Sequence, residues 1–366
     1  MTAKLTRDTA GPAVILSILL ASASALLSGI CYAEFSSRVS RYGSAYVYCY
    51  TTLGEIWAFV VGWTMILEYC IVGAILARTC SEYVDFIFKG EIYNLFKEKV
   101  ATWNYPLLGP FPDFLALFLV ITVSVFVCFG MHYVVIFNGA LLLFSSIALV
   151  LLFVIGLFLV RPDNWLHKFA PYGVQGVIRA AGSGYYAFIG VDVMAAASGE
   201  ATNPQSSVPL SIILTVTMTT ILYCGVASVI TLVTPYDQLS SLAPLANLFE
   251  AISGAQYVAA VGAVTCCSSG LVSCLVAGPR VLFSMANDGL LFMFCGGCDS
   301  DSTRAIEKSA LVICLLSGSL ATLFATEHLV CSFCRFTALI PAFIDFPLIS
   351  LRFAPNTRVW NLSRVV

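Results

Sequence analysis

The chain has 366 residues, of which 59% are hydrophobic and only 10% are charged, and its mean hydropathy is +0.92. About a quarter of the residues of a soluble domain are charged, so this composition indicates an integral membrane protein surrounded by a lipid bilayer. It leaves little room for a soluble domain, and no basic stretch suggests a nucleic-acid partner. We therefore expect a single transmembrane domain over residues 1–366.

Apolar runs long enough to cross a bilayer, which takes about 20 residues, follow one another along the chain. We expect about nine spans, the count that this length requirement gives. They lie near residues 12–33, 44–77, 113–130, 134–160, 178–198, 209–233, 256–285, 309–326 and 336–353. The first run is too long for the apolar core of a signal peptide, so we interpret it as a true span. The sequence thus predicts an all-α membrane bundle.

The longest loop, near residues 79–112, mixes acidic, basic and aromatic side chains. This composition predicts a short surface helix followed by a turn-rich stretch. Cys80 would be exposed in this loop and available for a disulfide with another protein, but nothing else in the sequence indicates one. We expect no obligatory protein partner.

Residues 182–200 are the stretch around which the chain is organised. They lie in an apolar segment, yet they include Gly182, Gly184, Gly190 and Gly199 and an acidic residue, Asp192. A break in a membrane helix is tolerated where the freed backbone groups line a cavity, and transporters use such breaks to bind substrates or ions. The alternative is a glycine-rich face that lets helices pack closely.

Two carboxylates fall in the second predicted span. At about 100° per residue, Glu55 and Glu68 lie about 220° apart on the helix, so they are not expected to share one site. A helix that begins near Ser44 would place Glu55 close to mid-depth, which favours a role in a cavity. Glu68 would lie nearer the far end, as an interfacial carboxylate or a partner for Arg78.

Other charged residues in the apolar segments have simpler interpretations. Asp192 is suited to cap the free N–H groups of the second half-helix, which would itself help to build a site. Glu200 is expected to end that half-helix at the membrane face. Arg335 and Asp345 share the last predicted span, and the sequence assigns neither a function.

No constellation typical of an enzyme is present. The three histidines, His132, His167 and His328, are scattered near the ends of segments. Most of the 14 cysteines lie in apolar runs, where Cys behaves as a small hydrophobic residue. There is no phosphate-binding loop of the kind that binds ATP. We expect neither enzymatic activity, nor a metal, nor a cofactor.

The sequence resembles the cationic amino-acid transporters of the amino-acid/polyamine/organocation superfamily. The resemblance is carried by short blocks in the family's order. They include AGPAVILS at 10–17, CYAEF at 31–35, GEIWAF at 54–59, YAFIGVD at 186–192, NPQ at 203–205, and DGLLF at 288–292. Each block is weakly specific, whereas the ordered set extends from about residue 3 to residue 326.

The resemblance implies a LeuT-type fold, in which two repeats of opposite topology surround a site near the membrane midplane. In that fold the first helix of each repeat is broken and the substrate lies between the breaks. Residues 178–198 match the broken helix of the second repeat. The resemblance implies that Phe188, Ile189, Gly190 and Asp192 face the substrate, and that Glu55 matches an acidic position important for transport.

The same alignment places Met1 at the end of the family's first helix. It therefore implies a chain that lacks the first helix and the C-terminal spans, as a truncated or degenerate copy would. We expect a secondary transporter of amino acids, cationic ones above all, that works by alternating access in the plasma membrane. The alternative is a transport-inactive membrane protein with a scaffold or regulatory role.

Overall fold

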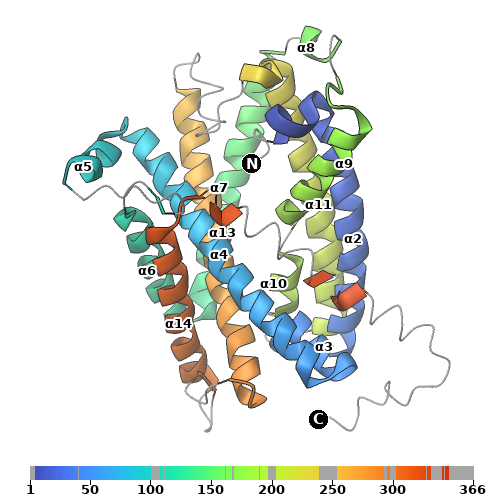
Figure 1. Cartoon of the computed structure of the whole chain (residues 1–366), viewed down its shortest axis with the longest axis vertical. Coiled ribbons are helices and arrows are strands. Elements are labelled where there is room, and N and C mark those ends of the chain that lie inside the picture. The colour runs from blue at the N-terminus through green and yellow to red at the C-terminus, as the bar shows by residue number, and fades with distance from the viewer. Residues whose placement is uncertain are drawn as a thin grey trace, which may run out of the picture.

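The computed structural model of the chain (Figure 1) describes residues 5–39, 41–99, 108–109, 112–160, 162–166, 169–188, 190–196, 203–238, 254–291, 295–296, 302–326, 328–330, 340–341 and 343–345. Within these ranges the regular structure is helical, and the backbone pairing between Leu108 and Phe324 is an isolated bridge. The predicted all-α class is confirmed.

Seven helices form the bulk of the described structure. They are α2 (Val14–Arg38), α4 (Glu55–Ile87), α6 (Phe114–Cys128), α7 (Met131–Leu157), α11 (Pro204–Val233), α13 (Ala255–Asn287) and α14 (Ser302–Leu323). By length and composition six of them can cross a membrane, and α6 is a shorter apolar helix. The last predicted span, 336–353, lies largely outside the described residues.

The second predicted span is not one helix from residue 44 to 77, and that prediction is wrong. The chain breaks at Gly54, whose φ of 94° and ψ of 179° are incompatible with a continuous α-helix. A short helix, α3 (Ala45–Leu53), precedes the break, and α4 begins at Glu55. Since α4 continues to Ile87, Cys80 is buried inside a helix and is not an exposed loop thiol. The expected surface helix is α5 (Glu91–Lys99).

The spans pack in pairs that reflect two repeats. Counted along the chain with the broken helix as one span, α2 packs against α11, α4 against α13, and α6 against α14. In each pair the partners lie five spans apart. These contacts join the first part of the bundle to the second, and α14 also packs against α4 and α13. In Figure 1, α4 runs diagonally across the view and crosses α13, with α14 on one side and α2 and α11 on the other.

Small residues set the distance between neighbouring helices. Helices in lipid associate by close packing, because the surrounding tails are as apolar as the side chains. Gly262 of α13 faces α7 so closely that an added Cβ would lie 2.6 Å from Cβ of Ala148. Gly278 lies further along α13. A Cβ added there would lie 3.4 Å from Cβ of Tyr69 on α4 and 3.3 Å from Cγ2 of Ile313 on α14.

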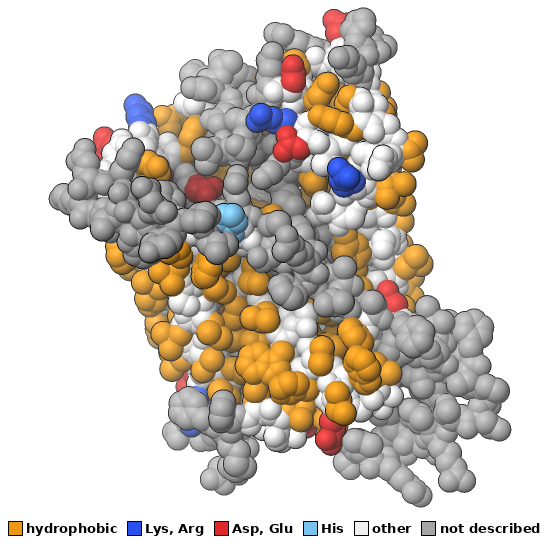
Figure 2. Space-filling view, viewed as in Figure 1, with side chains coloured by type: hydrophobic (Ala, Val, Ile, Leu, Met, Phe, Trp, Pro, Cys, Tyr) orange, Lys and Arg blue, Asp and Glu red, His pale blue; other side chains and the backbone are white. Residues whose placement is uncertain are grey.

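The outer surface is apolar where lipid would cover it. Large hydrophobic side chains stand exposed on three long helices, among them Leu143 and Phe144 of α7, Ile221 of α11 and Leu315 of α14. Figure 2 shows hydrophobic side chains over much of the lower half of one face, with most of the visible charged side chains towards its ends. A surface of this kind would promote aggregation in water and is stable in a bilayer. The protein is a multi-pass membrane protein.

Candidate functional site

The predicted break in the glycine-rich helix is present. A first half-helix, α9 (Gly173–Gly184), passes into one turn of 3-10 helix, η3 (Tyr185–Phe188), and a second half-helix, α10, covers Val191–Ala196. Between them Gly190 adopts a φ of 134°, which a residue with a side chain rarely tolerates. Glycine at this position therefore permits the chain to change direction inside the bundle. Ile189, the other residue at the break, lies outside the described residues.

Asp192 holds the break together. Its Oδ1 accepts a hydrogen bond of 3.1 Å from the backbone N–H of Gly190, and its Oδ2 accepts one from the hydroxyl of Tyr69 on α4. Only 7% of Asp192 is exposed. The interpretation of Asp192 as a cap for N–H groups freed by the break agrees with this geometry. The bond to Tyr69 also fixes the broken helix against α4, a contact that the sequence did not indicate.

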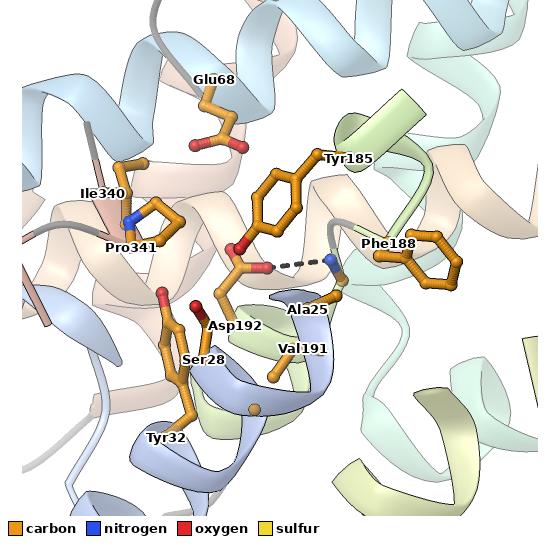
Figure 3. A pocket seen from close by; sticks show the side chains of 12 residues that line it. Ala25, Ser28, Tyr32, Glu68, Tyr185, Phe188, Val191, Asp192, Ile340 and Pro341 are labelled. Atoms are coloured by element: carbon orange, nitrogen blue, oxygen red, sulfur yellow. Dashed lines mark hydrogen bonds between the residues drawn. The ribbon is translucent and has the colours of Figure 1, made fainter. Parts of the chain in front are cut away.

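A pocket opens at the break (Figure 3). It is lined by Ala25, Ser28, Gly29 and Tyr32 of α2, Glu68 of α4, Tyr185, Phe188, Gly190, Val191 and Asp192 of the broken helix, and Ile340 and Pro341. Its volume is about 40 Å³, measured as the space open to the centres of water molecules. At about 10–15 Å³ for each water on this measure, it has room for about three. The described residues that line it include no Lys, Arg or His.

Glu68 is the second carboxylate of this pocket. It is 4% exposed, and Figure 3 shows its carboxylate pointing towards Tyr185 and Asp192. The prediction of an interfacial carboxylate or a partner for Arg78 was wrong. Because α4 begins at Glu55 and ends at Ile87, Glu68 falls near the middle of the helix instead of near its end. Glu68 is an isolated acidic residue within the long apolar run of α4, and this isolation is the sequence signal that indicates a role in a buried site.

Glu55 lies elsewhere. As the first residue of α4 it is exposed, and its Oε1 accepts a hydrogen bond of 3.3 Å from the hydroxyl of Tyr50 on α3. It does not line the pocket at the break, so the expectation of a mid-depth, cavity-facing Glu55 is not met by this structure. Its part in substrate binding stays a prediction without support from this geometry.

Arg78 of α4 is hydrogen-bonded to the end of α14. Its guanidinium donates hydrogen bonds to the carbonyl oxygens of Ala321 at 2.6 Å and Thr322 at 3.3 Å, near the end of α14. A cation is favourable there because the last carbonyl groups of a helix have no partner within it. Arg78 thus joins α4 to α14 and does not pair with Glu68.

The remaining predicted residues divide between the pocket and the undescribed parts of the chain. Phe188 lines the pocket and packs edge-on against Tyr223, with ring centres 5.6 Å apart. Asp345 accepts a hydrogen bond of 2.7 Å from Ser28 of α2, which ties the segment of Ile340 and Pro341 to the same helix. Glu200 and Arg335 lie outside the described residues.

Comparisons with known proteins agree with this architecture. The family model described as amino acid permease matches residues 2–363. Cationic amino acid transporter 4 of Mus musculus is 38% identical over 358 residues, and that of Homo sapiens is 37% identical over 362 residues. These alignments cover 96% and 98% of this chain, but only 56% and 57% of the two relatives, so the chain spans little more than half of their length.

A solved structure shows the fold independently. The crystal structure of MhsT in complex with L-phenylalanine superimposes with a TM-score of 0.67 at 14% sequence identity, covering 98% of this chain and 89% of that one. MhsT has the LeuT-type fold, and at this identity the similarity concerns the fold alone. Together with the paired spans, it confirms the expected LeuT-type helical bundle.

Proposed function

The chain belongs to the amino acid permease family, and from this premise we propose that it moves amino acids across a membrane by alternating access. The observation that carries the proposal is the break at Gly190, which opens onto a pocket lined by two buried carboxylates, Glu68 and Asp192, within a multi-pass bundle. Broken helices in transporters present unpaired backbone groups to the substrate near the membrane midplane. The backbone around Gly190 would bind the main-chain groups of the amino acid, and Phe188 would cover them.

A cationic substrate fits the pocket better than an anionic one. Glu68 and Asp192 both face it, and no basic side chain is found among the described lining residues. Buried carboxylates are costly in a membrane protein unless a positive charge compensates them. The names of the mouse and human relatives, cationic amino acid transporters, support the same substrate class. The pocket is too small for a whole amino acid, so it would hold only part of the substrate.

Uptake into vesicles tests this function. The purified chain is reconstituted into liposomes, and uptake of radiolabelled lysine, arginine and leucine is measured against empty liposomes. We expect saturable uptake of lysine and arginine that excess unlabelled lysine suppresses. If the folded chain takes up none of the three, transport is contradicted and a non-transporting membrane protein becomes the better interpretation. The plasma membrane is the proposed location, and biotinylation of intact cells that express the chain tests it.

Replacing Glu55 with glutamine tests the one predicted site residue that the described structure places outside the pocket. Since Glu55 is exposed and contacts Tyr50 instead of the break, we expect Glu55→Gln to leave the apparent affinity for lysine within about twofold. The concentration dependence of uptake measures this separately from the maximal rate. A loss of affinity of tenfold or more would return Glu55 to the substrate site.

A further inference from the structure

The two carboxylates of the pocket differ in their partners. Both oxygens of Asp192 accept hydrogen bonds, one from Tyr69 and one from the backbone of Gly190. Glu68 is buried, with only 4% of the residue exposed. Within the described part of the chain it nevertheless forms neither a hydrogen bond nor an ion pair. Asp192 therefore has a structural role that accounts for its charge. Glu68 has no comparable hydrogen bond to any described residue.

The surroundings of Glu68 favour a positive occupant. Among the described residues, the titratable groups that interact electrostatically with Glu68 are the carboxylate of Asp192, the hydroxyls of Tyr32, Tyr69 and Tyr185, and the thiol of Cys274. None of these is a cation. Asp192 and Glu68 repel each other when both are ionised, which raises the attraction of the space between them for a positive charge. The pocket is thus electrostatically incomplete without a cationic group.

We propose that Glu68 is the counter-ion for the cationic side chain of the transported amino acid, and that it determines the preference for lysine and arginine over neutral amino acids. This inference rests on the proposed transport function. An ammonium or guanidinium group in the pocket would find an acceptor at Glu68 whose lone pairs none of the described residues uses. The pocket's volume of about 40 Å³ suits such a head group, while the main chain of the substrate lies outside it at the break.

The test is a change of selectivity in a single variant. Glu68→Gln keeps the size and the acceptor oxygen of the side chain and removes the charge. We expect lysine uptake to fall at least tenfold, while leucine uptake stays within twofold or rises. Glu68→Asp keeps the charge on a shorter side chain and should retain part of the lysine preference. Glu91→Gln, on the exposed surface helix α5, removes one carboxylate elsewhere and is the matched control.

The outcomes separate this proposal from the function on which it rests. Uptake is compared only between variants whose melting midpoints in detergent show that they fold. Binding is measured separately, as the rise of this midpoint when lysine or leucine is added. If the unmutated chain neither takes up nor binds any amino acid, the transport function itself fails. If it transports both substrates and Glu68→Gln lowers both equally, or neither, the selectivity role of Glu68 is overturned. If Glu68→Gln instead abolishes a dependence of leucine uptake on Na⁺ or on a proton gradient, the occupant is an inorganic cation and the proposal is also wrong.

Discussion

Asp192→Ala is expected to destabilise the protein strongly and to abolish substrate binding at the break. The substitution leaves the hydroxyl of Tyr69 and the N–H of Gly190 without their acceptor in a buried site. Each buried donor that loses its partner costs about 1–3 kcal/mol. Because these two bonds hold the half-helix α10 both to the break and to α4, we expect a lower melting midpoint in detergent together with loss of lysine uptake.

Three further variants separate the contributions at Asp192. Asp192→Asn retains one acceptor oxygen and removes the charge, so it should be milder than Asp192→Ala in stability. Tyr69→Phe removes only the bond to α4, and with Asp192→Ala and the double variant it forms a cycle that measures their coupling. Asp163→Ala, at an exposed aspartate of α8 (Asp163–Leu166), is the matched control. If Asp192→Ala melts within one degree of the control, the carboxylate does not hold the break.

Gly262→Val is expected to separate α13 from α7. A Cβ at residue 262 would lie 2.6 Å from Cβ of Ala148, and neither atom can rotate away because each is attached directly to the backbone. The helices must move apart or bend, and overpacking of this kind costs about 1–3 kcal/mol in a well-packed core. The measurement is the melting midpoint of the purified variant, with the fraction that elutes as a single species in gel filtration.

Gly139→Val is the matched control for this substitution. Gly139 lies on α7, is exposed, and would bring a Cβ within 4 Å of no other atom outside its own helix. Both substitutions replace a helical glycine with the same β-branched residue, so the difference between them isolates the helix contact. Equal melting midpoints for the two variants would contradict the close packing of α13 on α7.

The sites of Glu55 and Glu68 show what sequence reasoning could and could not resolve. The sequence places both carboxylates in one span, with Glu55 near its middle and Glu68 nearer its far end, whereas in the structure Glu55 begins α4 and Glu68 lies near the middle of that helix. The assignment depends on where the helix begins, and the sequence does not show that the chain breaks at Gly54. Its φ of 94° instead ends α3 and starts α4, which moves the midpoint of the span towards Glu68. A glycine's conformation is decided by its surroundings, and a single sequence does not reveal it.

The sequence by itself determined the membrane class, the positions of most spans, and the break around Gly190. These properties follow from local composition, since apolar length, glycine and a nearby acidic residue are visible within a single segment. Only the tertiary structure decided which side chains meet at the break. Tyr69 of α4 donates a hydrogen bond to Asp192, and Glu68 of the same helix lines the same pocket; a contact between residues more than a hundred positions apart depends on how the helices pack. Among the described residues, the same packing gives both oxygens of Asp192 a hydrogen bond and gives Glu68 none, and the proposed selectivity rests on that difference.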